Sequence, residues 1–236
     1  MSARPILYER AGVDGLCPSP FCWRSRITLA IKGVAAERRA MRFADVDRLA
    51  EITGSRTVPV LAVDGAMVVG SDAIATHLDA TVRDAPRVMA DGSAEAGAEL
   101  ERELGARIGP LIGADFQRRL LAEDRDYYRR SREARYGRSF DELEGVRPGL
   151  ELDLAFSIGR LEPRLEEHRY LAGDEIGWVD IVAYTYLLSI AFGSPRSMPE
   201  LVNPVRTWFE RRDAEWRSIC LEPSVPESGP EPGPDL

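Results

Sequence analysis

Residues 17–34 read CPSPFCWRSRITLAIKGV, and this stretch decides the architecture of the first part of the chain. Ser19 and Pro20 form a helix start signal, because a serine N-cap and a first-turn proline both favour a helix beginning there. Apolar side chains then recur at helical spacing, at Trp23, Ile27, Ala30, Ile31 and Val34. The short apolar run at 6–8 precedes this helix and predicts a buried strand. The predicted order is therefore strand, loop, helix.

A β-hairpin is the next clear signal along the chain. A strand at 37–43 and a short helix at 45–52 are predicted first, from brief apolar patterns. Strands at 58–63 and 67–69 then flank Asp64-Gly65. Asp-Gly supplies the positive φ angles of a tight two-residue turn, so the two strands should pair antiparallel.

The rest of the chain divides into a helical part and a tail. Ser71 is predicted to cap one more helix, which completes a βαβαββα unit over residues 1–82. After a polar linker, only helical patterns follow over 93–220, so this part should be an all-α bundle. Residues 221–236 are rich in Pro, Gly, Ser and Glu and are predicted to be disordered.

Composition excludes several classes of function. The net charge of −8 disfavours sequence-independent nucleic-acid binding, which depends on basic side chains. Arginines do gather at 125–138, but acidic residues alternate with them, which predicts a solvated helix face. No apolar run reaches the ~20 residues that span a bilayer. We therefore expect no nucleic-acid partner and no membrane span.

Cysteine and histidine usage favours a cytoplasmic protein without a metal. Three cysteines, two of them close together at Cys17 and Cys22, argue against a secreted disulfide scaffold and fit a reducing cytoplasm. His77 and His168 are isolated and lack metal-ligand spacing. No metal site is predicted.

Four short motifs resemble those of the glutathione transferase superfamily. They occur in the family's order, at Ser19-Pro20-Phe21, Val58-Pro59, Ser71, and Leu171-Ala172-Gly173 leading into Trp178-Val179-Asp180-Ile181. The resemblance covers nearly the whole chain. It implies a thioredoxin-like N-terminal domain and an all-helical C-terminal domain, with Asp180 as a structural helix-capping residue.

A narrower resemblance is to the β-etherase and related fungal transferase branch, whose members act on lignin-derived aryl ethers. It rests on residues 19–24, on Gly109-Pro110, and on the motifs Asp124-Arg125-Asp126-Tyr127 and Ser131-Arg132-Glu133. Gly109-Pro110 is also expected to kink its helix.

The superfamily resemblance implies glutathione as co-substrate and assigns residues to it. Ser19 would stabilise the thiolate, although capping alone also explains a serine at this position. The main chain of Val58 would pair with the cysteinyl part, and Pro59 would keep that edge open. Ser71 would hold the γ-glutamyl carboxylate at a helix N-terminus. Gly70 departs from the family's Glu or Gln, so Asp72 is expected to bind the ligand's amino group instead.

The electrophile should be a hydrophobic aromatic compound, held by Phe21, Ile112, Phe116 and Tyr127. Core packing explains the first three of these equally well. Two other functions stay open: a catalytically silent transferase-like binding module, which Gly70 favours, and a glutathione-dependent thiol reductase that uses Cys17. The resemblance further implies a homodimer.

Overall fold

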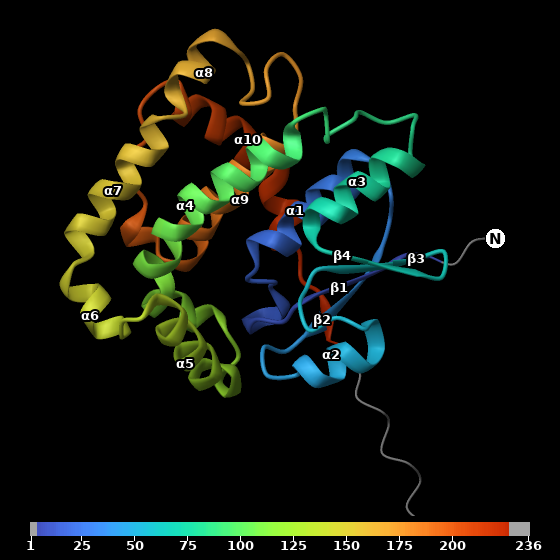
Figure 1. Cartoon of the computed structure of the whole chain (residues 1–236), viewed down its shortest axis with the longest axis horizontal. Helices are drawn as coiled ribbons and strands as arrows, with labels where there is room; N and C mark the ends of the chain where they lie inside the picture. Colours follow the sequence, from blue (N-terminus) through green and yellow to red (C-terminus); the bar gives the residue numbers. More distant parts are fainter. Residues whose placement is uncertain (1–3, 227–236) are drawn as a thin grey trace, which may run out of the picture.

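The computed structural model describes residues 4–226. It has two domains: the first is a mixed β-sheet with the α-helices α1 to α3, and the second is a bundle of the α-helices α4 to α10 (Figure 1). The elements of the first domain are β1 (Ile6–Arg10), α1 (Pro20–Ile31), β2 (Glu37–Met41), α2 (Val46–Thr53), β3 (Val60–Val63), β4 (Ala66–Val69) and α3 (Ser71–Thr81). This is the predicted βαβαββα order.

The second domain is entirely helical, apart from a two-residue strand after its last helix. Its elements are α4 (Ser93–Phe116), α5 (Arg125–Tyr136), α6 (Phe140–Gly145), α7 (Arg147–Gly159), α8 (Glu162–Glu167), α9 (Trp178–Gly193), α10 (Val205–Leu221) and β5 (Val225–Pro226). The helix α4 continues through Pro110 as one element.

The hairpin forms where the sequence predicts it. Asp64 and Gly65 have φ angles of 48° and 78°, the left-handed conformation that a tight hairpin turn needs. The first strand begins at Val60 rather than at Val58, and Val60 pairs with Tyr8 of β1.

The sheet has the strand order β4-β3-β1-β2-β5, with β1 parallel to β2 and antiparallel to β3. Helices cover both faces. Leu29 of α1 and Ile74 of α3 pack with Leu7 of β1 on one face, whereas Leu49 of α2 packs with Met41 of β2 on the other. This arrangement confirms the predicted thioredoxin-like domain.

The helix α9 forms the centre of the helical domain. Its sequence has no charge after Asp180, which predicts a helix buried on all sides. Only Val179 and Ala191 in it are partly exposed. The prediction is confirmed, and α9 packs against both α4 and α1, so it joins the two domains.

The segment after α10 corrects part of the predicted disordered tail. Val225–Pro226 pairs in parallel with β2 and adds an edge strand to the first domain. Ser224 is buried and hydrogen-bonded to Glu9 and Arg26. Composition alone could not show this, because buried partners from the first domain hold the segment. The remaining residues of the predicted tail, 227–236, lie outside the described part of the chain.

Within residues 4–226, no helix combines the length and the apolar character needed to cross a bilayer. The same residues hold no cluster of three or more potential metal ligands.

Candidate active site

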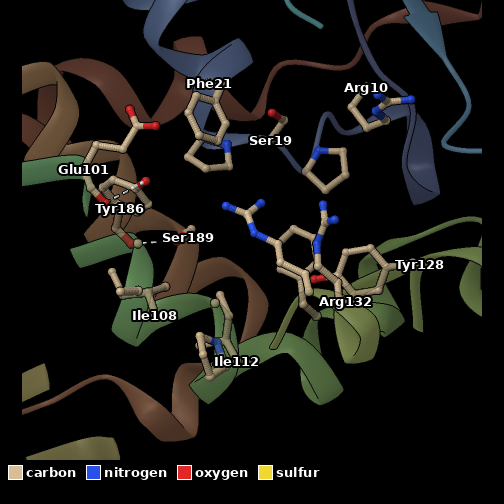
Figure 2. A pocket seen from close by; sticks show the side chains of 18 of the residues that line it. Arg10, Ser19, Phe21, Glu101, Ile108, Ile112, Tyr128, Arg132, Tyr186 and Ser189 are labelled. Carbon is tan, nitrogen blue, oxygen red and sulfur yellow. Dashed lines mark hydrogen bonds between the residues drawn. The ribbon is translucent and has the colours of Figure 1, made fainter. Parts of the chain in front are cut away.

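A cavity with a volume of about 740 Å³ lies between the two domains. The start of α1 and the loop after β2 line it from the first domain, and α4, α5 and α9 line it from the second. Figure 2 shows Arg10, Ser19 and Phe21 on one wall, with Ile108, Ile112, Tyr128 and Arg132 on the facing wall. We call this space the interdomain cavity.

Ser19 lies at the N-cap of α1, as the sequence predicts. Its Oγ accepts a long hydrogen bond of 3.4 Å from the main-chain N–H of Cys22. A hydroxyl that accepts in this way keeps its own proton to donate. Ser19 is only partly buried and lines the interdomain cavity, so the capping role and a role toward a ligand are compatible.

A second, smaller cavity of about 530 Å³ adjoins the first. It is lined by the predicted residues Val58, Pro59, Ser71 and Asp72. The two cavities share the lining residues Phe21, Thr57, Val58, Glu101 and Arg102. We call this space the cradle, since it lies along the main chain that precedes β3 and at the start of α3.

The main chain at Val58 is free of strand pairing. The register between β1 and β3 ends at Tyr8 and Val60, so Val58 lies beyond the paired residues. The Val58-Pro59 peptide bond is cis. Val58 lines both cavities.

The start of α3 corrects the expected capping role of Ser71. The N-cap is Gly70, with φ 97°, and no side chain caps the helix. Ser71 is buried in the first turn, where main-chain N–H groups have no partner within the helix. A helix N-terminus of this kind favours an anion. The sequence could not show the shift, because serine is common at both positions.

Asp72 takes up the space that a side chain at position 70 would need. A Cβ built on Gly70 would lie 3.0 Å from the Asp72 carboxylate oxygen. The carboxylate of Asp72 therefore lies next to Gly70, and Asp72 lines the cradle.

The residues expected to bind the electrophile are brought together with one exception. Phe21, Ile112 and Phe116 line the interdomain cavity, but Tyr127 lies outside both cavities and is 39% exposed. Its neighbour Tyr128 lines the interdomain cavity instead and stacks on Phe116, with ring centroids 5.8 Å apart. Consecutive residues of a helix point about 100° apart, so α5 can turn only one of the two tyrosines inward.

Sequence reasoning missed the arginines of the interdomain cavity. Arg132 and Arg135 belong to the run predicted to be a solvated helix face; Arg135 is exposed and Arg132 partly buried, and both also line the cavity. Arg129 shows the predicted pairing of alternating charges on a helix face, because its Nε lies 3.0 Å from Oε1 of Glu133, one turn further along α5. The signal was the spacing of Tyr128, Arg132 and Arg135 at i, i+4 and i+7, which puts them on one helix face.

An ion pair between a buried arginine and a partly exposed glutamate lies where the two cavities meet. The Nη1 of Arg24 in α1 is 2.6 Å from a carboxylate oxygen of Glu101 in α4. The Arg24 guanidinium is fully buried and lies between the rings of Phe21 and Tyr186, 4.5 Å and 4.9 Å from their centroids. This pair joins the two domains and neutralises the acidic residue of the interdomain cavity.

The structural role expected for Asp180 is confirmed. Its carboxylate is buried and accepts hydrogen bonds from the main-chain N–H groups of Leu171, Ala172 and Gly177 and from the indole of Trp208. Through these hydrogen bonds, Asp180 of α9 holds the loop at Leu171, Ala172 and Gly177 and also contacts Trp208 of α10.

None of the three cysteines lines either cavity. Cys17, Cys22 and Cys220 are all fully buried. Burial raises the pKa of the Cys17 thiol well above its ordinary value. A protonated and inaccessible thiol is a weak nucleophile.

The fold and the site thus define a class: a thioredoxin-like domain joined to an all-helical domain, with two adjoining cavities between them. Family comparison is consistent with this class. Residues 18–81 match the model described as glutathione S-transferase, N-terminal domain, and residues 98–219 match that of the glutathione S-transferase C-terminal domain. The chain belongs to the glutathione S-transferase family.

Solved structures share the fold over nearly the whole chain. A glutathione S-transferase of Ceriporiopsis subvermispora, in complex with glutathione, is 17% identical, covers 94% of this chain and 100% of its own, and has a TM-score of 0.82. Glutathione transferase GSTFuA3 from Phanerochaete chrysosporium is 20% identical, with coverage of 93% and 96% and a TM-score of 0.73. Glutaredoxin 2 from Salmonella typhimurium, also in complex with glutathione, is 18% identical, with coverage of 90% and 94% and a TM-score of 0.73.

Proposed function

We propose that the protein is a glutathione transferase that activates the glutathione thiolate at Ser19 for attack on an aromatic electrophile. One observation carries the proposal: Ser19 places a hydroxyl and the N-terminus of α1 at the wall of the interdomain cavity, which adjoins the cradle. Family membership supplies the co-substrate, and two of the similar solved structures hold glutathione.

The energy required is within reach of these groups. A thiol with a pKa near 8.5 must drop by about two units to be mostly ionised at neutral pH, which takes about 2.7 kcal/mol. A hydroxyl that donates to the charged sulfur contributes roughly 1.5 to 3 kcal/mol. The helix N-terminus adds roughly 0.3 to 1 kcal/mol.

The cradle would hold the remainder of glutathione. The unpaired main chain of Val58 suits the cysteinyl amide groups, and the N-terminus of α3 at Ser71 suits the γ-glutamyl carboxylate. Asp72, which stands above Gly70, would accept from the ligand's ammonium group. Pro59 lacks an N–H and keeps the edge of β3 from pairing further.

The interdomain cavity would hold the electrophile against Phe21, Ile112, Phe116 and Tyr128. Two reactions fit a thiolate and an aromatic wall: addition to an electrophilic carbon, and displacement of a phenolate from an aryl ether, as in the β-etherase branch. In the addition, the S–C bond forms as the attacked double bond opens and its other atom takes up a proton; in the displacement, the S–C bond forms as the C–O bond breaks and the phenolate leaves with the electron pair.

The decisive experiment is a glutathione titration at neutral pH that follows thiolate absorbance, in the wild type and in Ser19→Ala. Saturable binding with a thiolate signal that Ser19→Ala abolishes is expected. Ser139→Ala is the matched control, because Ser139 also caps a helix, α6, but lies far along the chain and lines neither cavity. A thiolate signal that survives in Ser19→Ala would refute the assignment.

A catalytically silent binding module is the second candidate, and Gly70 is the observation that favours it. Without the family's acidic or amide side chain, glutathione loses one contact. The same titration decides: no binding in the wild type would support the silent module. A reductase working through Cys17 has little support, since that thiol is buried and protonated.

We also infer a homodimer from family membership. The outer strand β4 carries the exposed apolar side chains Met67 and Val69, at 44% and 42% exposure. Light scattering that gives the mass of one chain at micromolar concentration would exclude the dimer.

A further inference from the structure

Arginine is concentrated in the interdomain cavity. Four arginines line it: Arg10, Arg102, Arg132 and Arg135. They come from three different elements, β1, α4 and α5. Among residues 4–226, none of the four forms an ion pair with a carboxylate, whereas Arg129 of α5 pairs with Glu133 and Asp141.

The acidic side chain in the cavity does not offset this charge. Glu101 is the single carboxylate among the described lining residues, and it is held by Arg24, which lies behind the wall. Arg10 is buried, donates to the carbonyl of Arg42 and has the Asp124 carboxylate nearby, whereas Arg102, Arg132 and Arg135 are partly or fully exposed at the cavity without an ion-pair partner among the described residues. Arginine stays protonated throughout the accessible pH range, so this charge is permanent.

Aromatic rings accompany the arginines on α5. The guanidinium carbon of Arg132 lies 5.0 Å from the ring centroid of Tyr128, and its Nη1 donates to Ser131 Oγ at 3.3 Å. Tyr136, one turn beyond Arg132, lines the same cavity. Figure 2 shows Arg132 and Tyr128 together on the wall that faces Ser19. A guanidinium fork beside flat apolar rings matches an anionic group attached to an aromatic frame.

We propose that the interdomain cavity binds an aromatic compound that carries an anionic group, a carboxylate or a sulfonate, and that this compound is the electrophile. The inference rests on the proposed function for the role of the cavity and narrows its substrate class. Glutathione is itself anionic, but Arg132 and Arg135 line the interdomain cavity alone, whereas Arg102 also borders the cradle. The two α5 arginines are therefore placed to bind the electrophile and not the glutathione in the cradle.

The test compares two fluorescent aromatic probes, anilinonaphthalene sulfonate and its uncharged counterpart phenylnaphthylamine, in the full-length protein. The double variant Arg132→Gln/Arg135→Gln removes both α5 charges from the cavity. The double variant Arg130→Gln/Arg138→Gln is the control, since it makes the same change in net charge at exposed positions that line neither cavity. Glutathione affinity and thiolate absorbance are measured in every variant.

We expect the cavity variant to weaken sulfonate binding about ten-fold or more, which corresponds to the loss of one or two charge-assisted hydrogen bonds. Binding of the uncharged probe and of glutathione should change less than about two-fold, and the control should bind all three ligands like the wild type. Added salt should weaken only the sulfonate.

The other outcomes are equally clear. Unchanged sulfonate affinity, or an equal loss for both probes, would overturn the inference. A loss of glutathione affinity instead would assign the arginines to the tripeptide and would also overturn it. Charge discrimination in a protein that forms no thiolate would support the anion site, but it would disprove the proposed function and with it the role of the anionic compound as electrophile.

Discussion

The guanidinium of Arg26 donates two parallel hydrogen bonds to the carboxylate of Glu9, from Nε to Oε2 at 2.8 Å and from Nη2 to Oε1 at 2.6 Å. Both side chains are almost fully buried. The remaining Nη1 protons of Arg26 reach the carbonyls of Ile219, Cys220 and Glu222 at the end of α10. One side chain of the first domain thus satisfies main-chain carbonyls at the C-terminus of the last helix of the second domain.

Replacing Arg26 should be far more costly than replacing a surface arginine. Arg26→Met leaves the buried carboxylate of Glu9 without its partner, and such a change lowers the free energy of unfolding by about 3–5 kcal/mol. Arg38→Met, which breaks the partly exposed pair with Glu222, should cost at most about 1 kcal/mol. Denaturant unfolding measures both. If the double variant Glu9→Met/Arg26→Met were no more stable than Arg26→Met, the penalty would not come from the orphaned charge.

Asp72→Asn should weaken glutathione binding and leave thiolate formation intact. Its carboxylate stands over Gly70 in the cradle, where we propose that it accepts from the ligand's ammonium group. Loss of that charge on an exposed side chain should raise the Kd for glutathione roughly ten-fold, near the lower limit for a charged hydrogen bond. The thiol pKa of bound glutathione should not move, because Ser19 is untouched. Asp84→Asn, at an exposed linker position outside both cavities, is the control.

Gly109→Ala should reshape the interdomain cavity. A Cβ at position 109 would lie 2.7 Å from the hydroxyl of Tyr136, so that ring must move. We expect the KM for bulky electrophiles to change several-fold while the KM for glutathione stays constant, because Tyr136 lines the interdomain cavity alone. Gly149→Ala, with open space around the new methyl group, should leave both constants unchanged. Equal effects of the two substitutions would rule out this account.

Asp115 should govern the stability of the protein in acid. Burial alone would raise its pKa, but hydrogen bonds from Arg196, Ser194 and Arg118 lower the pKa well below its usual range. A carboxyl with a lowered pKa stabilises the fold above its unfolded pKa of about 4, and this contribution disappears as the pH falls below that value.

Asp115→Asn should therefore reduce the free energy of unfolding at pH 7 and flatten its decline in acid. Asp91→Asn removes a carboxylate that is 99% exposed and should leave the profile unchanged. A variant at Asp115 whose profile paralleled that of the wild type below about pH 4 would show that the network does not favour the charged form.

Local signals made much of the fold predictable. Asp64-Gly65 specifies its turn by backbone conformation alone, and the uncharged run after Asp180 specifies a central helix by burial alone. The N-cap position of Ser19 was predictable for the same reason, because a serine followed by a first-turn proline favours a helix start. Each of these features depends on residues close together in the sequence.

The missed features depend on which face of an element meets a distant partner. Tyr127 and Tyr128 are equivalent as residues, and only the contact of α5 with Phe116 selects the second. Alternating charges at 125–138 predict solvation, yet α5 turns Arg132 and Arg135 toward a cavity that another domain helps to form. The pairing of β5 with β2 has no local pattern at all.

That last pairing completes the sheet of the first domain with residues that are translated after the whole helical domain. The first domain leaves the ribosome with the outer edge of β2 uncovered and with Arg26 lacking the carbonyls of residues 219, 220 and 222, because these belong to the last part of the described chain to be made. A nascent N-terminal domain is thus an unfinished sheet with an open edge, the feature that most invites wrong pairing between chains. Residues 219–226 supply both the strand that covers the edge of β2 and the carbonyls that Arg26 binds, so the first domain is complete only after they have been translated.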